Sequence, residues 1–452
     1  MLSPKFFRAM LCVLMIAQAR HSRAVEPAVT KTLAKDGGAV PVVRLAAGEL
    51  WSHLKSASDF GEVREASIAW QQSAAGGRLT IETRPSRYAW VVIPPPTAGW
   101  ELGSCEAVEA IIVNRGLKSV EVLMWVVGDR GWESIADTAK LEPGEQRLFS
   151  CKLRATFPDG TYKLDPGRIR QLQIMVSRTN HEATLEVSRL IAVGDVPVWQ
   201  RPSQRMEVPP VEDTRPFPGH RVRYRLVDEA QPSIYGVLQL PQEWKEGDRY
   251  PVIVEYPGNI FFTAGCYSTG LPDQCVIGYG MTRGKRAICI GLPFIDRRTG
   301  AIAEHGWGNA DETADYAMHF IEEVCQKFGG DRSNLVLTGF SRGAIACGYI
   351  GLRNDRIASL WKGFHACQHY DGDGWNGATM EGAMERAQRF VGRSVFQTDN
   401  SEATFQPLME AMNTQAIFVR SGLGAHATAM FLDDRPSTLQ LRAWFDDLVS
   451  QP

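Results

Sequence analysis

The chain has 452 residues, 44% of them hydrophobic, so its length allows two to three domains with well-buried cores. Its 49 Lys and Arg residues nearly balance 51 Asp and Glu residues, and the net charge is −2. No block of like charge occurs, so the sequence gives no support for a nucleic acid or an acidic membrane as a partner. No Cys/His spacing indicates a metal site, so none is expected.

Residues 1–24 have the pattern of a secretory signal peptide. Lys5 and Arg8 precede an apolar run at 9–17, and Ser22-Arg23-Ala24 provides the small residues of a cleavage site. The apolar run is too short to span a bilayer, and no later stretch is long or apolar enough to do so. We therefore expect a secreted or periplasmic protein with no membrane span.

Residues 39–196 consist of short β-type runs separated by Gly, Pro, Asn and Asp turns. The clearest runs are 78–83, 89–93, 108–114, 120–127 and 172–176. This spacing, with almost no helical periodicity, predicts an all-β sandwich of jelly-roll type. Prolines then crowd residues 197–220, which is typical of a stiff linker or a docked strap.

From residue 221 to 452, β-type runs alternate with helical segments. The strand candidates include 235–240, 252–254 and 287–290, and a helix is predicted over 312–328. This rhythm predicts a mostly parallel sheet with helices on both faces, that is, a domain of the α/β class. Its length suits one catalytic domain.

The most informative segment of this domain begins with the apolar run 335–338. It continues through Gly339-Phe340-Ser341-Arg342-Gly343 into the small residues Ala344-Ile345-Ala346. A serine on a sharp strand-to-helix turn, with glycine two residues before and two after, is the pattern of a nucleophile elbow. Ser341 is therefore the predicted catalytic nucleophile.

Two further groups are needed downstream of the serine, an acid and then a histidine. His426 follows a β-type run at 416–419 and precedes a helix predicted from about Pro436, which is the place of the general base. Three carboxylates are candidates for the acid. Asp399 ends the strand-like run before His426 and ranks first, Glu402 lies a few residues further on, and Asp371 ranks third.

The oxyanion hole is predicted from the loop after the strand at 250–256. Gly258 and Asn259 stand there, and the backbone N–H of Arg342 would be the second donor. Aromatic residues that follow sheet strands, where α/β folds bind ligands, are candidates for substrate binding or for closing the core. They are Trp307, Tyr370 and Trp375.

Eight cysteines remain once Cys12 is removed with the signal peptide. Cys266 and Cys275 could staple a loop, and Cys105 could bridge to Cys151. The other four, Cys289, Cys325, Cys347 and Cys367, fall in apolar segments typical of buried free thiols.

On the strength of Ser341, the Pro257-Gly258-Asn259 loop and His426, residues 221–452 resemble a secreted α/β-hydrolase of the serine esterase type. The run Gly339-Phe340-Ser341-Arg342-Gly343 is also similar to that of glucuronoyl and acetyl-xylan esterases, although it has Phe340 where the glucuronoyl esterase pattern has cysteine. Residues 39–196 resemble, in architecture alone, the carbohydrate-binding-like sandwiches attached to polysaccharide-degrading enzymes. This resemblance implies an ester substrate linked to plant or algal glycans.

The sequence thus predicts a serine esterase that works through an acyl-enzyme and needs no cofactor. A serine peptidase of the prolyl-oligopeptidase type is an alternative, although the N-terminal region lacks the blade repeats of that family. A non-catalytic glycan-binding protein with a retired hydrolase fold is the alternative from another class.

Overall fold

The computed structural model describes residues 49–451, apart from 75, 130, 132, 201, 203–205, 264, 425 and 427–430. The predicted signal peptide lies outside the described residues. Among the helices that are described, none combines the length and the apolar character needed to cross a membrane.

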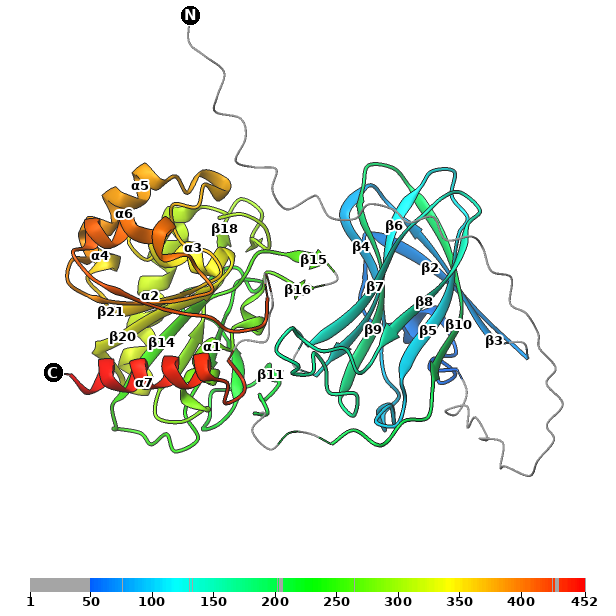
Figure 1. The fold of residues 1–452 in the computed structure, drawn as a ribbon, viewed down its shortest axis with the longest axis horizontal. Coiled ribbons are helices and arrows are strands. Elements are labelled where there is room, and N and C mark those ends of the chain that lie inside the picture. The colour runs from blue at the N-terminus through cyan, green and yellow to red at the C-terminus, as the bar shows by residue number, and fades with distance from the viewer. Residues whose placement is uncertain are drawn as a thin grey trace, which may run out of the picture. The chain divides into compact units, whose positions relative to one another are not determined.

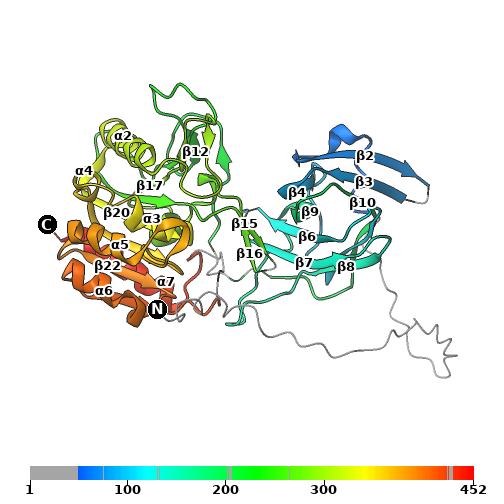
Figure 2. The same cartoon turned by 90° about the horizontal axis from the view of Figure 1, so that it is seen from above.

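The predicted all-β region is a sandwich of two five-stranded antiparallel sheets (Figure 2). The first sheet has the order β1 (Val63–Arg64), β4 (Ser86–Ile93), β9 (Ile169–Thr179), β6 (Val120–Gly128) and β7 (Ser134–Leu141). The second has the order β2 (Ala66–Ser73), β3 (Gly76–Thr83), β10 (Ala183–Val193), β5 (Ala107–Asn114) and β8 (Gln146–Lys152). Each of the five β-type runs predicted for this region lies within one of these strands.

Alternating side chains from both sheets fill one apolar core between them. Leu79, Ile112 and Leu185 enter it from the second sheet, and Val122 and Ile174 enter it from the first. Strand β6 differs from its neighbours because eight of its nine residues are buried, including those on the outer face. A strand buried on both faces has a nearly continuous apolar sequence, which is the character of residues 120–127.

The C-terminal region is built on a nine-stranded mixed sheet (Figure 1). Its order is β11 (Val211–Glu212), β12 (Arg221–Tyr224), β13 (Gly236–Gln239), β17 (Ile288–Gly291), β14 (Tyr250–Tyr256), β20 (Gly330–Phe340), β21 (Trp361–Cys367), β22 (Ser394–Thr398) and β23 (Ala416–Val419). The strands from β17 to β23 run parallel, and β13 runs antiparallel to both of its neighbours. The proline-rich segment 197–220 contributes strand β11 to this sheet.

Seven α-helices are described along this region, and two of them match the predicted helices closely. Helix α2 begins after Asn309, whose side chain accepts hydrogen bonds from two backbone N–H groups, and it ends at the left-handed Gly329. Helix α7 begins at Pro436, a residue favoured in the first turn. The helices are α1 (Ile277–Thr282), α2 (Ala310–Phe328), α3 (Arg342–Tyr349), α4 (Asp355–Ala358), α5 (Met380–Ala387), α6 (Glu402–Met412) and α7 (Pro436–Ser450).

Apolar side chains cover the mixed sheet on both faces. Val252 and Val254 of β14 join a cluster with helices α2 to α6, whereas Ile253 between them joins a second cluster with α1 and α7. Because successive side chains of a strand point to opposite faces, this division assigns one helix group to each face. The structure confirms a largely parallel sheet with helices on both faces.

The chain between β14 and β17 contains a hairpin that packs on the outer face of β6. Its strands are β15 (Phe261–Thr263) and β16 (Cys266–Ser268). Phe262 and Tyr267 of the hairpin are buried against Trp90 and Trp125 of the sandwich, with the ring of Phe262 5.8 Å from Trp90 and that of Tyr267 5.1 Å from Trp125. The apolar outer face of β6 is therefore an interior surface.

The eight cysteines predicted for the mature chain are all free thiols, so the two possible disulfides are not formed. The strand register explains why Cys105 and Cys151 form no disulfide, because Cys151 pairs with Val108 and Cys105 lies outside the paired segment. The Cys275 thiol lies against the Glu255 carbonyl oxygen at 3.6 Å. No group of three or more metal-ligating side chains occurs among the described residues.

Candidate active site

Ser341 lies at the junction of β20 and α3, on a backbone turn that non-glycine residues rarely adopt. Its φ is 54° and its ψ is −119°, a conformation that costs roughly 1–3 kcal/mol and is concentrated at functional sites. Its backbone N–H donates to the Cys367 carbonyl oxygen at 3.1 Å, which fixes the turn against the neighbouring strand β21.

The two glycines of the motif are required by close backbone contacts. A Cβ at Gly343 would lie 1.9 Å from the carbonyl oxygen of Tyr256, and a Cβ at Gly339 would lie 2.2 Å from the backbone of Gly343. Helix α3 can therefore lie against the end of β14 only if both positions lack a side chain. This contact brings the start of α3 beside the loop that follows β14.

His426 meets Ser341 in the loop between β23 and α7. Its Nε2 is 3.0 Å from the serine Oγ. Its ring lies between those of Phe261 and Phe340, at 5.3 and 5.4 Å between centroids. Burial, and secondarily the nearby charge of His369, lower the pKa of His426 to about 4. The imidazole is thus neutral at ordinary pH and can accept a proton from the hydroxyl.

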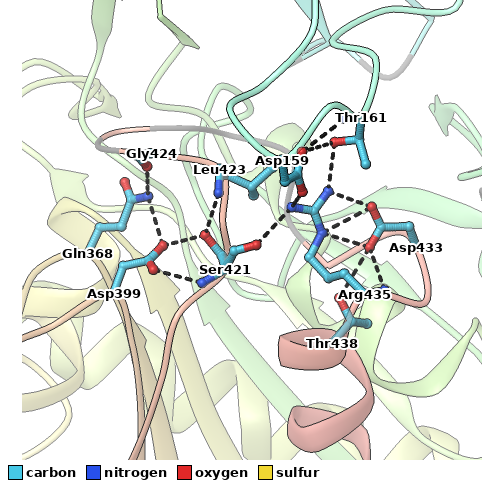
Figure 3. A network of polar contacts seen from close by, with 10 residues as sticks. All are labelled: Asp159, Thr161, Gln368, Asp399, Ser421, Leu423, Gly424, Asp433, Arg435 and Thr438. Carbon is cyan, nitrogen blue, oxygen red and sulfur yellow. Dashed lines mark hydrogen bonds and ion pairs between the residues drawn. The ribbon is translucent and has the colours of Figure 1, made fainter.

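Asp399 follows β22 and is joined to the loop that carries His426 (Figure 3). Its carboxylate accepts hydrogen bonds from the backbone N–H and the hydroxyl of Ser421, at 2.8 and 2.5 Å. The Gln368 amide donates to Asp399 at 3.4 Å and to the Gly424 carbonyl oxygen at 3.0 Å. Asp399 therefore binds Ser421 directly and is linked through Gln368 to Gly424, two residues before His426.

The other two candidate acids lie elsewhere. Asp371 forms a two-pronged ion pair with Arg386, at 2.7 and 2.8 Å, and burial raises the pKa of its carboxyl group. Glu402 is the exposed first residue of α6. The Nδ1 atom of His426 has no hydrogen-bond partner within the described part of the chain.

The loop after β14 lies beside the start of α3, where the sequence predicts the oxyanion hole. Asn259 is buried, and its Oδ1 accepts a hydrogen bond from the Gly306 N–H at 3.0 Å. This contact joins the Gly258–Asn259 loop to the segment 303–306. Arg342 is the first residue of α3, so its backbone N–H has no acceptor within the helix.

The side chain of Arg342 binds protein rather than projecting into solvent. Its guanidinium donates to four carbonyl oxygens at 2.8–3.0 Å, those of Gly258, Gly270, Ala303 and Gly306. It also lies 3.9 Å from the centre of the Phe294 ring. Burial lowers its pKa to about 9. Arg342 thus ties three loops together around the turn at Ser341, a role that its place after the serine did not reveal.

The predicted substrate-binding aromatics have different environments. Trp307 is buried, its indole N–H donates to the Asn376 carbonyl oxygen, and its ring stacks on Tyr349. Trp375 packs edge-on against Trp307 and remains partly exposed. Tyr370 is partly exposed and packs on Phe405. Their contact with substrate stays a prediction.

A polar network extends from the His426 loop to a turn of the sandwich (Figure 3). Arg435 donates to the Ser421 carbonyl oxygen at 3.0 Å and to Asp159 at 2.7 Å, and it also donates to Thr161. Its side chain is 8% exposed, so this ion pair is shielded from solvent. The N-terminal region thus contacts the loop that carries His426 by a route that no local sequence pattern could indicate.

No known protein family and no curated protein matches the sequence. Solved structures similar to part of the chain include an esterase from Rhizomucor miehei, with 12% identity and a TM-score of 0.34 over 50% of this chain and 82% of that one. A feruloyl esterase module from Clostridium thermocellum, complexed with sinapinate, has 13% identity and a TM-score of 0.31 over 55% and 95% of the two chains. A family 11 carbohydrate-binding module from the same organism matches 30% of this chain and 87% of its own, with 14% identity and a TM-score of 0.22. An exo-beta-agarase is matched over 26% of its length and 33% of this chain, with 17% identity and a TM-score of 0.25. These scores are low, so we base the function on the geometry of the site.

Proposed function

We propose that this protein is a serine hydrolase that cleaves carboxylic esters through an acyl-enzyme. The observation that carries the proposal is the 3.0 Å contact between Ser341 Oγ and His426 Nε2, on a strained turn between a strand and a helix. The fold we propose is the α/β-hydrolase fold, supported by a largely parallel sheet whose strand β20 ends at Ser341.

In the first step, His426 accepts the hydroxyl proton while Ser341 Oγ forms a bond to the ester carbonyl carbon. The tetrahedral intermediate collapses as His426 returns the proton to the departing alcohol oxygen, which leaves an acyl group on the serine. Water then attacks the acyl group, its proton passes to His426, and the carboxylic acid is released as Ser341 regains its proton. The reaction needs no cofactor.

We propose Asp399 as the acid that orients His426. Its carboxylate holds the segment just before the histidine, and an ionised carboxylate can accept up to about four hydrogen bonds, so it retains capacity for the imidazole N–H. The backbone N–H groups of Arg342 and of the Gly258–Asn259 loop are the proposed donors to the oxyanion. The Arg342 side chain supports this arrangement by binding the Gly258 carbonyl oxygen.

We further propose that the ester is carried by a polysaccharide outside the cytoplasm, as the resemblance of the sequence to secreted esterases implies. A hydrolysis panel tests the substrate class: acetylated xylan, feruloylated arabinoxylan, uronate esters and short peptides. Hydrolysis of the peptides alone would favour the peptidase alternative. N-terminal sequencing of exported protein tests cleavage after Ala24.

A fluorophosphonate probe tests the nucleophile, because it reacts only with an activated serine. We expect labelling of Ser341 and a loss of roughly 10³-fold or more in ester turnover in Ser341→Ala. The matched control is Ser359→Ala, which removes an exposed hydroxyl bonded to the Arg356 carbonyl oxygen and should retain turnover. Labelling of another residue, or full turnover by a folded Ser341→Ala, would contradict the proposal.

A further inference from the structure

Two arginines of the sandwich lie near the hairpin that contacts His426 and have no counter-charge among the residues described. Arg87 belongs to β4 and Arg178 to β9, and the register of these antiparallel strands sets the two residues opposite each other. Both side chains are exposed, and neither forms an ion pair or a hydrogen bond within the described part of the chain. Like charges opposite each other on adjacent strands are destabilising, and each guanidinium is offset only by one ring contact, Arg87 with Tyr88 and Arg178 with Phe261.

The ring of Phe261 lies between the Arg178 side chain and His426. The Arg178 guanidinium carbon lies 5.8 Å from the centre of the Phe261 ring, and that ring lies 5.3 Å from the ring of His426. Arg178 also has a φ of 50°, an uncommon conformation for a residue other than glycine. Its backbone is thus unusual at the point where its side chain approaches the active site.

Arg87 approaches the same hairpin, since its guanidinium carbon lies 5.8 Å from the centre of the Tyr88 ring and that ring lies 5.0 Å from the ring of Phe262. The positive charge of Arg87 also acts on His305, because burial and then Arg87 lower the pKa of that histidine. His305 precedes Gly306, whose N–H is bound by Asn259 of the predicted oxyanion loop. The register therefore places both guanidinium groups on neighbouring strands beside the hairpin that carries Phe261.

A third arginine of the same sheet, Arg64, does have a carboxylate partner. Arg64 of β1 forms a two-pronged ion pair with Glu304, at 3.0 and 2.6 Å, and stacks on Trp90. Glu304 is the residue next to His305. The chain thus supplies a carboxylate for Arg64 and none, among the described residues, for Arg87 or Arg178.

We propose that Arg87 and Arg178 bind an anionic group of the substrate, a carboxylate or a sulfate, carried on the same molecule as the ester that Ser341 attacks. The planar guanidinium matches the paired oxygens of such groups. This inference rests on the proposed esterase function and narrows its substrate to acidic esters, which for a glycan are esters of uronate-bearing or sulfated chains.

The test uses three acetate esters that share one phenol ring: 4-acetoxybenzoate, its neutral methyl ester, and 4-acetoxybenzenesulfonate. Acetate release by the full-length mature chain is measured for each ester at low and high NaCl. We expect kcat/KM to favour an anionic ester over the neutral one, and the preference to fall with salt because exposed charges are screened over about 8 Å at physiological ionic strength. The two anionic esters separate a carboxylate site from a sulfate site.

The variants are Arg87→Gln, Arg178→Gln and the double substitution. We expect each single variant to lower the anionic-to-neutral ratio of kcat/KM by roughly fivefold to tenfold, somewhat less than a buried charge-assisted hydrogen bond would give because both side chains are exposed, and the double variant to abolish the preference. Arg178→Lys keeps the charge and should retain part of it. Arg189→Gln is the matched control because Arg189 is also exposed with a positive φ, yet lies on β10 of the other sheet.

The preference of the double variant decides the inference. A ratio equal to that of the parent protein, or a parent protein with no preference at low salt, would overturn the anion site while leaving the esterase function intact. Failure to release acetate from any of the three esters would count against the esterase function. In that event calorimetry with 4-hydroxybenzoate and 4-hydroxybenzenesulfonate tests the arginines directly, and equal binding by the parent and the double variant overturns the inference.

Discussion

Replacing Arg342 by glutamine should lower both the stability of the fold and the rate of catalysis, and the two effects can be measured separately. The guanidinium is 1% exposed and donates to four carbonyl oxygens from three loops. Glutamine is shorter and offers two donors, so at least two of these carbonyl groups would lose their partner inside the protein. A hydrogen bond from a charged donor contributes about 1.5–3 kcal/mol, and the burial cost of the removed charge offsets part of that loss. We expect Arg342→Gln to lower the free energy of unfolding by about 3–5 kcal/mol.

Catalysis should suffer in addition, because Arg342 holds the loop that contains the proposed oxyanion donors. Removing one such donor costs on the order of 10²–10³ in kcat, and displacing the loop should have a similar effect. Urea denaturation measures the first quantity, and kcat for 4-nitrophenyl acetate, at a temperature where the variant is folded, measures the second.

Arg393 provides the matched control. It is partly buried and donates to three carbonyl oxygens, those of Ala358, Trp361 and Arg389, near the start of β22 and away from Ser341. Arg393→Gln should therefore destabilise the fold and leave kcat of the folded protein unchanged. The reasoning is refuted if Arg342→Gln keeps both parental stability and parental kcat, or if the two variants lower kcat equally.

Three further predictions follow from the site. Asp399→Asn should lower kcat by up to about 10⁴-fold, and Asp371→Asn by far less, since Asp371 is bound to Arg386; a larger effect of Asp371→Asn would assign the acid to that residue. The acid limb of kcat/KM should lie at a pH of about 4 rather than near 6.5, because the base acts only when neutral and burial lowers the pKa of His426. His369→Gln should move this limb to higher pH by removing a positive neighbour, and a limb unaffected by the substitution would contradict that cause. Phe262→Ala should lower the free energy of unfolding by about 3–5 kcal/mol in urea denaturation, because the ring is buried. It should also reduce ester turnover, since the adjacent Phe261 contacts His426. A loss of stability below about 1 kcal/mol would show that this ring does not hold the hairpin in place.

The elements that the sequence predicts correctly are those whose signal is local. The strand before Ser341, the turn itself and helix α2 each have their apolar period, their glycines or their capping residue within a few positions. His426 was selected by its place in the chain order, and the structure brings its ring to Ser341. Such features depend on residues that are neighbours in sequence or on a fixed topology.

The features that the sequence did not reveal depend on pairs of distant segments. Asp399 binds the His426 loop at Ser421, and Gln368, the residue after β21, binds the same loop at Gly424, yet neither residue belongs to a recurring motif. The β15–β16 hairpin shows only two short runs, and its stability comes from Trp90 and Trp125, which precede it by more than a hundred residues. Packing between distant segments decides which two apolar runs contact each other. The alternation of apolar and polar residues within one run does not indicate which other run it will pack against.

The unpaired thiols have a practical consequence for anyone who handles this protein. Seven of the eight are buried and Cys289 is partly buried, and burial raises the pKa of both Cys266 and Cys289 to about 12. The thiolate, which is the reactive form, is therefore scarce and shielded in the folded chain, so an oxidising buffer should leave the native protein intact. The unfolded chain exposes all eight and can cross-link at random, which makes a reductant necessary during refolding. A brief pulse of an alkylating reagent would accordingly modify only those cysteines whose surrounding structure has unfolded, and mass spectrometry would show how many of the eight are modified.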